Sequence, residues 1–301
     1  MDKPRVTIII TNYNYDKFLK EAIDSALKQT YLNTEVVVVD DGSTDNSRDI
    51  IKSYGDKIVP VLKENGGQAS AFNAGFAASR GETICFLDSD DMFMPEKVAE
   101  IVEILGSDQD LGWCYHPVQL IDSNTGKITK SSYEWLSSEY DLRSSIARGK
   151  LRGKLPCYPA TSGLCFRRSL LQQILPMPEA TDVSISDNYI KFTALGLSKG
   201  FALAKELALQ GIHNDNAFTF RKDKQQLTAR IHILTAYWMR HKFPMLSKFA
   251  NNLFAIGIGT YWRTGSIEAT SQAVVQSYLS PLLPWERLEI NFRALYHYLK
   301  R

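Results

Sequence analysis

Three carboxylates, Asp88, Asp90 and Asp91, stand together directly after an apolar segment, residues 83–87. This segment lacks the alternation of a half-exposed strand, so we expect a strand that is buried on both faces of a parallel sheet. In open α/β sheets, the residues that follow such strands lie in the ligand crevice. Crowded carboxylates repel one another unless a cation joins them, and their oxygens suit Mg²⁺ or Mn²⁺, which bridge phosphates. The pattern indicates a metal-dependent site for a phosphorylated ligand, or alternatively a solvated acidic turn that caps a helix from Pro95 onward.

Three further apolar segments precede this one, and each ends in a polar loop. Strands are predicted at residues 6–11, 35–39 and 57–62, and helices at 17–29, 43–53 and 68–79. Four strands that alternate with helices predict a parallel sheet with right-handed crossovers. The loops at 11–16, 40–43, 65–68 and 88–91 would then share one edge of the sheet.

In the second half of the chain, the regular alternation of predicted strands and helices ends. After a helix predicted at 95–105, the sequence predicts a strand at 111–121, a hairpin turn at 122–126 and a partner strand at 127–131. Further on it predicts helices around 169–174 and 185–197, and a strand at 201–209. From residue 223 the pattern is helical, with breaks at Pro244, Gly265, Pro281 and Pro284. We therefore expect an α/β domain with a C-terminal helical appendix.

The loops do not match the common phosphate-binding motifs. The sequence has no Walker loop, and the loop after the first strand, Thr-Asn-Tyr-Asn-Tyr, has no dinucleotide fingerprint. Asp88-Ser89-Asp90 resembles the acid pair of aspartate phosphatases, but Asp91 follows where those enzymes need Thr or Val. Tyr13 is suited to stacking on a base, and Asp41 can accept an N–H from a base edge. The residues together indicate a nucleoside diphosphate held across several loops.

Composition and charge set broad limits. The 301 residues, 44% hydrophobic and 23% charged, are typical of one large or two modest globular domains. The net charge of +2 is uneven, because residues 221–301 contain twelve Lys/Arg and four Asp/Glu, a net +8, which leaves −6 for the rest. We expect no nucleic-acid partner. A basic C-terminal region favours an anionic partner such as a membrane surface or an acidic protein, unless the charges only mark solvated faces. The cluster 238–243 fits an interfacial helix or simple core packing.

The cysteines and the first residues bear on location. Four cysteines, without a C-x-x-C pair, favour reduced thiols over a disulfide framework or a zinc site. The chain starts without a signal-peptide pattern, and no apolar run approaches the roughly 20 residues of a spanning helix. We expect a cytoplasmic protein that extends, through its basic region, to the inner face of the membrane.

Four short motifs at the ends of the four predicted strands carry a family resemblance. They are Thr11-Asn12-Tyr13-Asn14, Val39-Asp40-Asp41-Gly42-Ser43, Asn65-Gly66-Gly67 and Leu87-Asp88-Ser89-Asp90-Asp91. Each is weak alone, but in this order and spacing they resemble an inverting family-two glycosyltransferase of the GT-A fold. The resemblance is strong from residue 6 to about 105, looser to 216, and absent from the last eighty residues. It implies a mostly parallel Rossmann-like sheet flanked by helices. It also implies three parts: a nucleotide-sugar-binding half (1–110), an acceptor-binding half (111–220) and a helical C-terminal region (221–301).

The resemblance also implies roles for single residues. Asp88 would contact the ribose, Asp90 would bind the metal directly, and His213 would add a second metal ligand. Asp91 would lie behind the metal ligands or cap the next helix, and 161–163 would border the sugar and the acceptor. The remaining donor-binding residues implied by the family are Thr11, Tyr13, Asp41, Gly67, Asn73 and Ser89.

An inverting transfer needs one general base for the acceptor hydroxyl. The family places it in an acidic pair, often Glu-Asp, that opens a helix in the second half of the chain. Here the pair reads Ser186-Asp187, so Asp187 is the expected base, and its alternative role is the N-cap of that helix.

The resemblance therefore implies transfer of a sugar, with Mn²⁺ or Mg²⁺, from a nucleotide-sugar, expected to be a UDP-sugar. The acceptor would be a glycan or a lipid-linked hydroxyl in polysaccharide, glycolipid or cell-surface glycan synthesis. One rival is a sugar nucleotidyltransferase, but the first loop lacks the Gly-rich, Arg-containing sequence of that class. The other is a catalytically degenerate, nucleotide-binding relative, which Ser186 leaves open. For the C-terminal region, peripheral membrane contact and a homodimer contact both remain open.

Overall fold

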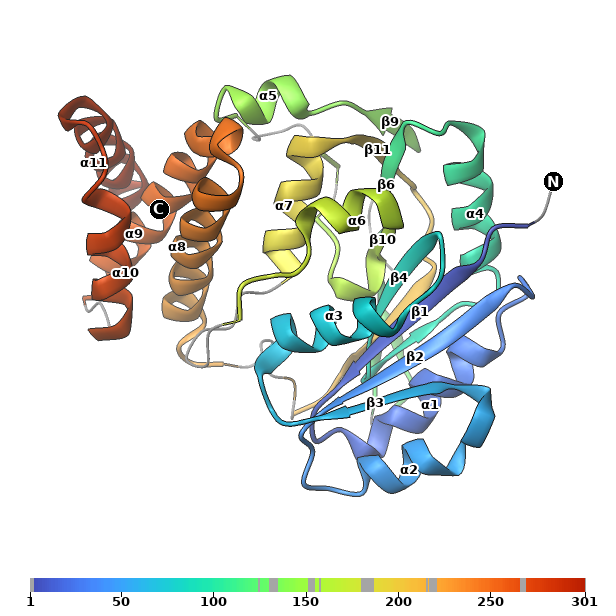
Figure 1. Cartoon of the computed structure of the whole chain (residues 1–301). Coiled ribbons are helices and arrows are strands. Elements are labelled where there is room, and N and C mark those ends of the chain that lie inside the picture. Colours follow the sequence, from blue (N-terminus) through green and yellow to red (C-terminus); the bar gives the residue numbers. More distant parts are fainter. Residues whose placement is uncertain are drawn as a thin grey trace.

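The computed structural model describes residues 3–123, 125–129, 135–150, 155–156, 158–179, 187–214, 216, 221–265 and 269–300. An α/β domain, called the sheet domain below (residues 3–216 as described), is followed by a group of C-terminal helices (Figure 1).

The first half of the sheet domain has the predicted parallel strands. They are β1 (Val6–Asn12), β2 (Thr34–Asp41), β3 (Val59–Lys63) and β4 (Thr83–Asp88), in the order β3-β2-β1-β4. The helices between and after them are α1 (Asp16–Leu27), α2 (Ser47–Ser53), α3 (Gly67–Ala78) and α4 (Lys97–Ser107). The third strand begins two residues later than predicted because a 3-10 turn, η1 (Gly55–Lys57), precedes it.

Both faces of this sheet are covered, as the unbroken apolar runs predicted. Ile8 and Ile10 pack with α1 and α4 on one face, while Ile9 packs with Phe72 of α3 on the other. The same second face is covered by α6 (Arg168–Ile174) and α7 (Asp187–Leu197), and α5 (Arg143–Ala147) lies beside α7 (Figure 1).

The sheet continues beyond β4 in mixed orientation. The strand β10 (Leu164–Arg167) inserts antiparallel between β4 and β6 (Leu111–Tyr115), β11 (Lys199–Ala202) pairs parallel with β6, and β9 (Ser138–Tyr140) closes the edge. Four of the seven neighbouring pairs are parallel, in agreement with a mostly parallel sheet. The helix predicted around residues 169–174 is present as α6, and β10 precedes it.

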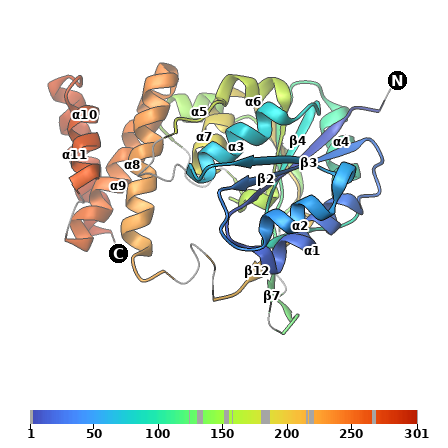
Figure 2. The same cartoon turned by 60° about the horizontal axis from the view of Figure 1, so that its bottom comes forward.

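Two predicted strands are each divided between two sheets. Residues 111–121 form β6 and then β7 (Gln119–Asp122), because Pro117 lacks the N–H that a continuous strand needs. The strand predicted at 201–209 is divided in the same way: residues 201 and 202 are the last two of β11, and residues 208 and 209 are the first two of β12 (Ala208–Ile212). A small second sheet, β5-β12-β7-β8, contains β5 (Asp91–Phe93) and β8 (Ile128–Thr129), the described part of the predicted hairpin. β7 and β12 project together from one edge of the domain (Figure 2).

The C-terminal region is helical and breaks where the sequence predicted. Its elements are α8 (Lys224–Lys242), η3 (Pro244–Leu246), α9 (Ser247–Thr264), α10 (Ala269–Leu279) and α11 (Pro284–Leu299). Gly265 ends α9 in the left-handed conformation, with φ of 85°. Among the helices that the structure describes, none combines the length and apolar composition needed to cross a bilayer.

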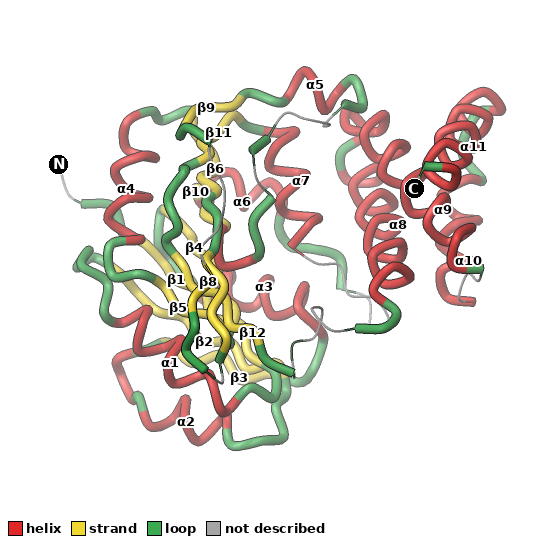
Figure 3. The backbone as a smooth tube through the Cα atoms, turned by 180° about the vertical axis from the view of Figure 1, so that it is seen from behind, coloured by secondary structure: helices red, strands yellow, loops and turns green. Residues whose placement is uncertain are grey.

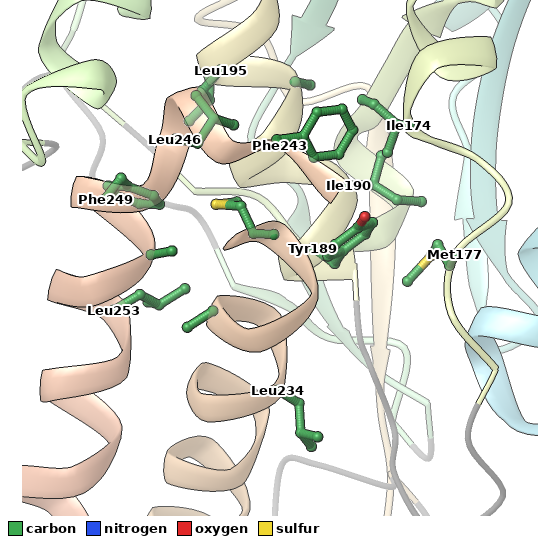
Figure 4. Packing of buried hydrophobic residues seen from close by; sticks show 14 of the residues in the cluster. Ile174, Met177, Tyr189, Ile190, Leu195, Leu234, Phe243, Leu246, Phe249 and Leu253 are labelled. Carbon is green, nitrogen blue, oxygen red and sulfur yellow. The ribbon is translucent and has the colours of Figure 1, made fainter. Parts of the chain in front are cut away.

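One hydrophobic core joins the C-terminal helices to the sheet domain. Tyr189 and Ile190 of α7 face Leu234 and Phe243 of α8 in a continuous apolar cluster (Figure 4). In the cluster 238–243, Met239 and Phe243 are buried, and Lys242 Nζ donates to the Ile174 carbonyl at 2.6 Å. Core packing, one of the two roles considered for this cluster, therefore accounts for these contacts.

Candidate active site

The sheet register brings the four polar loops to one edge. Thr11 pairs with Asp88 across β1 and β4, Asn12 pairs with Asp40, and Asp41 pairs with Lys63. Because these strands are parallel, the residues after each carboxyl end meet at the same side of the sheet.

The first two loops are held together by hydrogen bonds that leave Tyr13 exposed. Asn12 Nδ2 donates to Asp40 Oδ2 at 3.1 Å, and the Asn14 amide donates to Ser43 Oγ at 2.9 Å. Asn14 has a positive φ of 58°, a conformation that asparagine tolerates. The side chain of Tyr13, between these fixed residues, is 47% exposed. Nearly half of this residue is therefore open to solvent, and its stacking role stays a prediction.

Asp40, at the end of β2, is a buried structural carboxylate. Burial would raise its pKa, but hydrogen bonds from Ser43, Arg48 and Asn12 outweigh burial and hold the pKa below its usual value. Arg48 Nε donates to Asp40 Oδ1 at 2.8 Å. Asp40 therefore stays charged and fixes the loops.

Asp41 organises the loop after β3. Its carboxylate accepts from Lys63 Nζ at 2.6 Å, from the Gly66 amide at 3.0 Å and from the Gly67 amide at 2.7 Å. Gly67 has φ of 81°, which disfavours any residue with a side chain. To accept an N–H from a base, Asp41 would share an oxygen with one of these donors, so its predicted role stays a prediction.

Asn73, the remaining residue predicted for the nucleoside pocket, makes three hydrogen bonds within the protein through its side-chain amide. Its Nδ2 donates to the Met177 carbonyl and to Glu179 Oε1, each at 2.8 Å, and its Oδ1 accepts from the Met177 amide at 2.7 Å. Asn73 thus ties residues 177–179 to α3. A hollow of about 550 Å³ adjoins it, and its contact with a nucleoside stays a prediction.

The carboxylates after β4 lie close enough to repel one another. Burial, followed by the charges of Asp91, Asp90 and Asp187, raises the pKa of Asp88 well above its usual value. Burial also raises the pKa of Asp90, against the lowering effects of His213 and Asn216. The predicted base, Asp187, therefore reaches the same charge cluster although it follows Asp88 by 99 positions in the sequence. A divalent cation in this cluster would relieve the repulsion.

Asp90 and His213, the two predicted metal ligands, are neighbours. His213 Nε2 lies 3.3 Å from Asp90 Oδ2, and Asn216 Nδ2 donates to the same oxygen at 3.1 Å. The His213 ring stacks on Phe18 with centroids 4.1 Å apart. β12 positions the histidine, because Gln210 pairs with Asp91 across β12 and β5.

These residues fit Mg²⁺ or Mn²⁺ that is shared with a phosphate ligand. Within the residues that the structure describes, no group of three or more His, Cys, Asp or Glu side chains is arranged to hold a metal by itself. Mg²⁺ in such sites is commonly bound by one or two carboxylates together with substrate phosphates and water, without an all-protein cage. The Asp90 and His213 pair offers one oxygen and one nitrogen for that arrangement.

Asp91 and Ser89, the neighbours of Asp90 in the sequence, are both buried. Asp91 accepts from Ser162 Oγ at 2.6 Å and from the Gly211 amide at 3.0 Å, and burial followed by the charge of Asp90 raises its pKa to about 8. Because α4 begins only at Lys97, Asp91 does not cap that helix, and its expected place behind the metal ligands stays a prediction. Ser162 is also buried, and its Oγ accepts from the Asp88 amide at 3.1 Å. Ser89, predicted to bind the donor, is itself buried.

Asp187 is the first described residue of α7 and lies one helical turn before a buried lysine, Lys191. Lys191 Nζ donates to Asp187 Oδ2 at 3.0 Å and to the Pro159 carbonyl at 2.9 Å. Ser186, its predicted companion, lies outside the described residues.

Sequence reasoning missed two residues that hold the site, Lys191 and Asn216. Lys191 follows Asp187 by four positions on a helix, a spacing that favours an ion pair and could have identified it. Asn216 meets Asp90 only through the tertiary fold, and we find no local sequence signal for it. Ser162 lies in the segment 161–163 that was expected to border the sugar and the acceptor, but its contact with Asp91 was not predicted.

The Rossmann-like sheet, with its acid-bearing edge and a continuation of mixed strand orientation beyond β4, defines a GT-A glycosyltransferase fold. The chain belongs to glycosyl transferase family 2, whose family model matches residues 7–175. The predicted family and fold are thus confirmed.

Among curated relatives, an uncharacterized glycosyltransferase of Nostoc sp. is 40% identical over 216 residues, 70% of this chain and 66% of that protein. One from Rickettsia typhi is 49% identical over 102 residues, 34% of this chain and 32% of that protein. The chain thus matches less than two thirds of each of these relatives.

Two solved structures have the same fold. S. aureus TarS, in complex with UDP-GlcNAc, superposes with a TM-score of 0.60 at 20% identity, covering 98% of this chain and 89% of that one. The mannosyltransferase PcManGT from Pyrobaculum calidifontis, in complex with GDP-Man and Mn²⁺, gives 0.52 at 19% identity, covering 99% and 87%. At these identities the likeness shows the fold alone.

Proposed function

We propose that this glycosyltransferase moves a sugar from a UDP-sugar to an acceptor hydroxyl with inversion, and that it requires Mn²⁺ or Mg²⁺. The observation that carries the proposal is the convergence of Asp88, Asp90 and Asp187 in one half-buried cluster, where burial and then the neighbouring charges raise the pKa of Asp88. Such a cluster, at the carboxyl edge of a sheet, suits a cation bound to a diphosphate.

The donor site in this proposal is formed by the loops after β1, β2, β3 and β4. Tyr13 stacks on the base, Asp41 accepts its ring N–H, and Thr11, Gly67 and the Asp88-Ser89 turn complete the pocket, with Asn73 behind it. TarS binds UDP-GlcNAc and PcManGT binds GDP-Man. Both complexes support a nucleotide-sugar donor.

Asp90 and His213 would hold the metal, which when bound supplies positive charge that stabilises the departing diphosphate. The Mn²⁺ in the PcManGT complex supports a divalent ion. Asn216 orients Asp90 from the side, and Phe18 holds the histidine ring in place.

Asp187 acts as the general base. Its carboxylate takes the proton of the acceptor hydroxyl while that oxygen forms a bond to the anomeric carbon. The bond between this carbon and the diphosphate oxygen breaks, and the nucleoside diphosphate leaves with the electron pair. Attack from the face opposite the leaving group inverts the configuration. Lys191 holds Asp187 in position through the 3.0 Å contact.

The division of the chain is also a proposal: 1–110 for the donor, 111–220 for the acceptor and 221–301 as the helical region. The acceptor would be a glycan or a lipid-linked hydroxyl in cell-surface polysaccharide or glycolipid synthesis. The cytoplasmic location and the peripheral membrane contact expected from the sequence stay predictions.

The test combines binding with turnover. Calorimetric titration of UDP with Mn²⁺ should give binding that is lost in EDTA, and UDP-sugars with candidate acceptors should release UDP and form a product of inverted anomeric configuration by NMR. Metal-dependent binding without turnover for any donor would favour the degenerate, nucleotide-binding relative. Absence of UDP binding in the presence of metal would show that the acidic edge is not a nucleotide site.

A further inference from the structure

The last helix presents an apolar surface on its outer side. Five large side chains of α11, called the α11 stripe, are between 44% and 72% exposed: Trp285, Leu288, Phe292, Leu295 and Leu299. The opposite side of the helix carries Ile290 and Ala294, which are buried. α11 lies at the edge of the helical region, away from the sheet (Figures 1 and 3).

The position of α11 is fixed by close packing on α9. A Cβ added at Gly259 of α9 would lie 2.5 Å from the Ala294 carbonyl oxygen and 2.9 Å from His297 Cβ. Gly257, two residues earlier, approaches Ile233 of α8 in the same way, at 2.7 Å. Because α9 is held tightly on both sides, α11 cannot rotate its stripe inward without separating from α9.

The spacing of the stripe is that of a helix–helix seam. Its members are separated by three, four, three and four residues, the repeat that places one line of side chains against a partner helix. A hollow of about 360 Å³, lined by Asn252, Phe292, Arg293, Tyr296 and His297, adjoins the stripe. It offers a place for a partner's side chain beside the seam.

The charges near the stripe argue for a protein partner over an anionic lipid surface. The two acids of α11 are both paired, Glu286 with Arg240 at 3.1 Å and Glu289 with Arg293 at 2.6 Å. Within α11 the two acids are matched by two arginines, Arg287 and Arg293, so the helix carries no excess of Lys and Arg. Tyr296, beside the stripe, is exposed. Interfacial helices carry many Lys and Arg residues on their polar face, whereas the centres of protein interfaces are depleted in charge and enriched in aromatic residues.

The exposed area matches what one partner of a dimer contributes. At their exposed fractions the five side chains present roughly 600 Å², and exposed Tyr296 beside them brings the total towards the ~800 Å² per partner of a standard interface. Apolar patches of this size are uncommon on monomers.

We propose that the α11 stripe binds the same stripe of a second copy of this chain, forming a twofold dimer. An isologous contact needs only one self-complementary surface. Phe292, the middle member of the stripe, would lie nearest the twofold axis, with the two sheet domains on the outside. This proposal does not depend on the proposed transfer reaction.

The test is sedimentation of the whole chain over a roughly hundredfold concentration range, since association follows mass action. The wild type should sediment with twice the mass of one chain. Phe292→Asp and Leu295→Lys should each sediment as monomers with unchanged circular dichroism and UDP binding. The matched control is Leu32→Asp, at a leucine that is 91% exposed outside the helical region, and it should remain dimeric.

Three outcomes would overturn the proposal. A monomeric wild type at every concentration would do so, as would a dimer that persists in both stripe variants. The third outcome uses vesicles of phosphatidylglycerol. If the wild type is monomeric and binds these vesicles, and if Leu295→Lys or Phe292→Asp abolishes the binding, the stripe binds lipid instead of a second copy. The two variants lie at different positions, so a folding defect in one leaves the other to decide.

Discussion

Asp187 and Lys191 form an ion pair across one turn of α7, with Asp187 Oδ2 3.0 Å from Lys191 Nζ. The lysine is buried, and its second hydrogen bond, to the Pro159 carbonyl at 2.9 Å, joins α7 to the segment before β10. The proposed base is therefore held from one side by a residue that is itself fixed. Such positioning limits the number of side-chain orientations that compete with the reactive one.

Replacing the proposed base should separate turnover from binding. We expect Asp187→Asn to lower kcat by a factor of about 10² to 10⁴, because the amide cannot accept the acceptor proton. UDP binding measured by calorimetry should change little. The matched control, Asp49→Asn, alters an exposed carboxylate of α2 and should leave both quantities unchanged. A neutral effect of Asp187→Asn on kcat would rule out this base.

Removing a proposed metal ligand should weaken the metal more than the fold. We expect Asp90→Ala to lower the Mn²⁺ affinity of the UDP complex by more than about tenfold, since even groups behind metal ligands contribute that much. His213→Ala should have an effect in the same direction. Calorimetry with Mn²⁺ measures both, and the melting temperature without metal serves as the control. Unchanged Mn²⁺ affinity in Asp90→Ala would contradict the assignment.

The stacking role of Tyr13 predicts a graded series. A base stacked on an aromatic ring contributes about 1–3 kcal/mol, so Tyr13→Ala should weaken UDP binding by about 5-fold to 150-fold. Tyr13→Phe keeps the ring and should bind within a small factor of wild type. Equal affinities for the alanine and phenylalanine variants would show that the ring does not stack on the base.

The first half of the fold could be predicted because its signals are local. Each of the four strands is a continuous apolar run, and each loop carries its polar residues at the carboxyl end, so Thr11, Asp41 and Asp88 could be assigned to one edge. The helix predicted at 185–197, described from Asp187 onward as α7, and the helix break at Gly265 were also visible in short stretches of sequence.

The second half of the fold could not be predicted in the same way, because its strands pair with strands that are distant in the sequence. β10 inserts between β4 and β6, and the single apolar run at 111–121 supplies strands to two different sheets. The contact of Asn216 with Asp90 spans 126 positions. The 3-4 spacing on α11 was present in the sequence, but only the packing of α9 determines which side of the helix is exposed.

Alanine substitutions at Gly259, where α9 packs on α11, and at Gly106, on α4, should change the free energy of unfolding in opposite directions. At Gly259, a Cβ would lie 2.5 Å from the Ala294 carbonyl oxygen, so Gly259→Ala should lower the free energy of unfolding by about 1–3 kcal/mol through overpacking. At Gly106, inside α4, a Cβ meets nothing within 4 Å, and Gly106→Ala should raise the free energy of unfolding by about 0.4–1 kcal/mol. Denaturant unfolding measures both, and effects of equal sign would contradict this account of the helix packing.

His232, on α8, predicts how acid affects the helical region. Burial, and then the charge of His297, lowers its pKa to about 4, and its Nδ1 has no hydrogen-bond partner among the described residues. The unfolded chain takes up this proton near pH 6.5, so between pH 6.5 and 4 the unfolded state binds more protons than the folded state. The free energy of unfolding should therefore fall as the pH drops through this range, by about 3 kcal/mol in total.

His232→Gln should remove this part of the pH dependence, because glutamine does not titrate. Urea unfolding at several pH values measures the difference in slope between the variant and the wild type. His241→Gln, at an exposed histidine of the same helix, is the matched control and should keep the wild-type slope. If the slope below pH 6.5 is the same in His232→Gln as in the wild type, acid destabilisation of this chain arises from other groups, and His232 is protonated in the folded protein near its ordinary pKa.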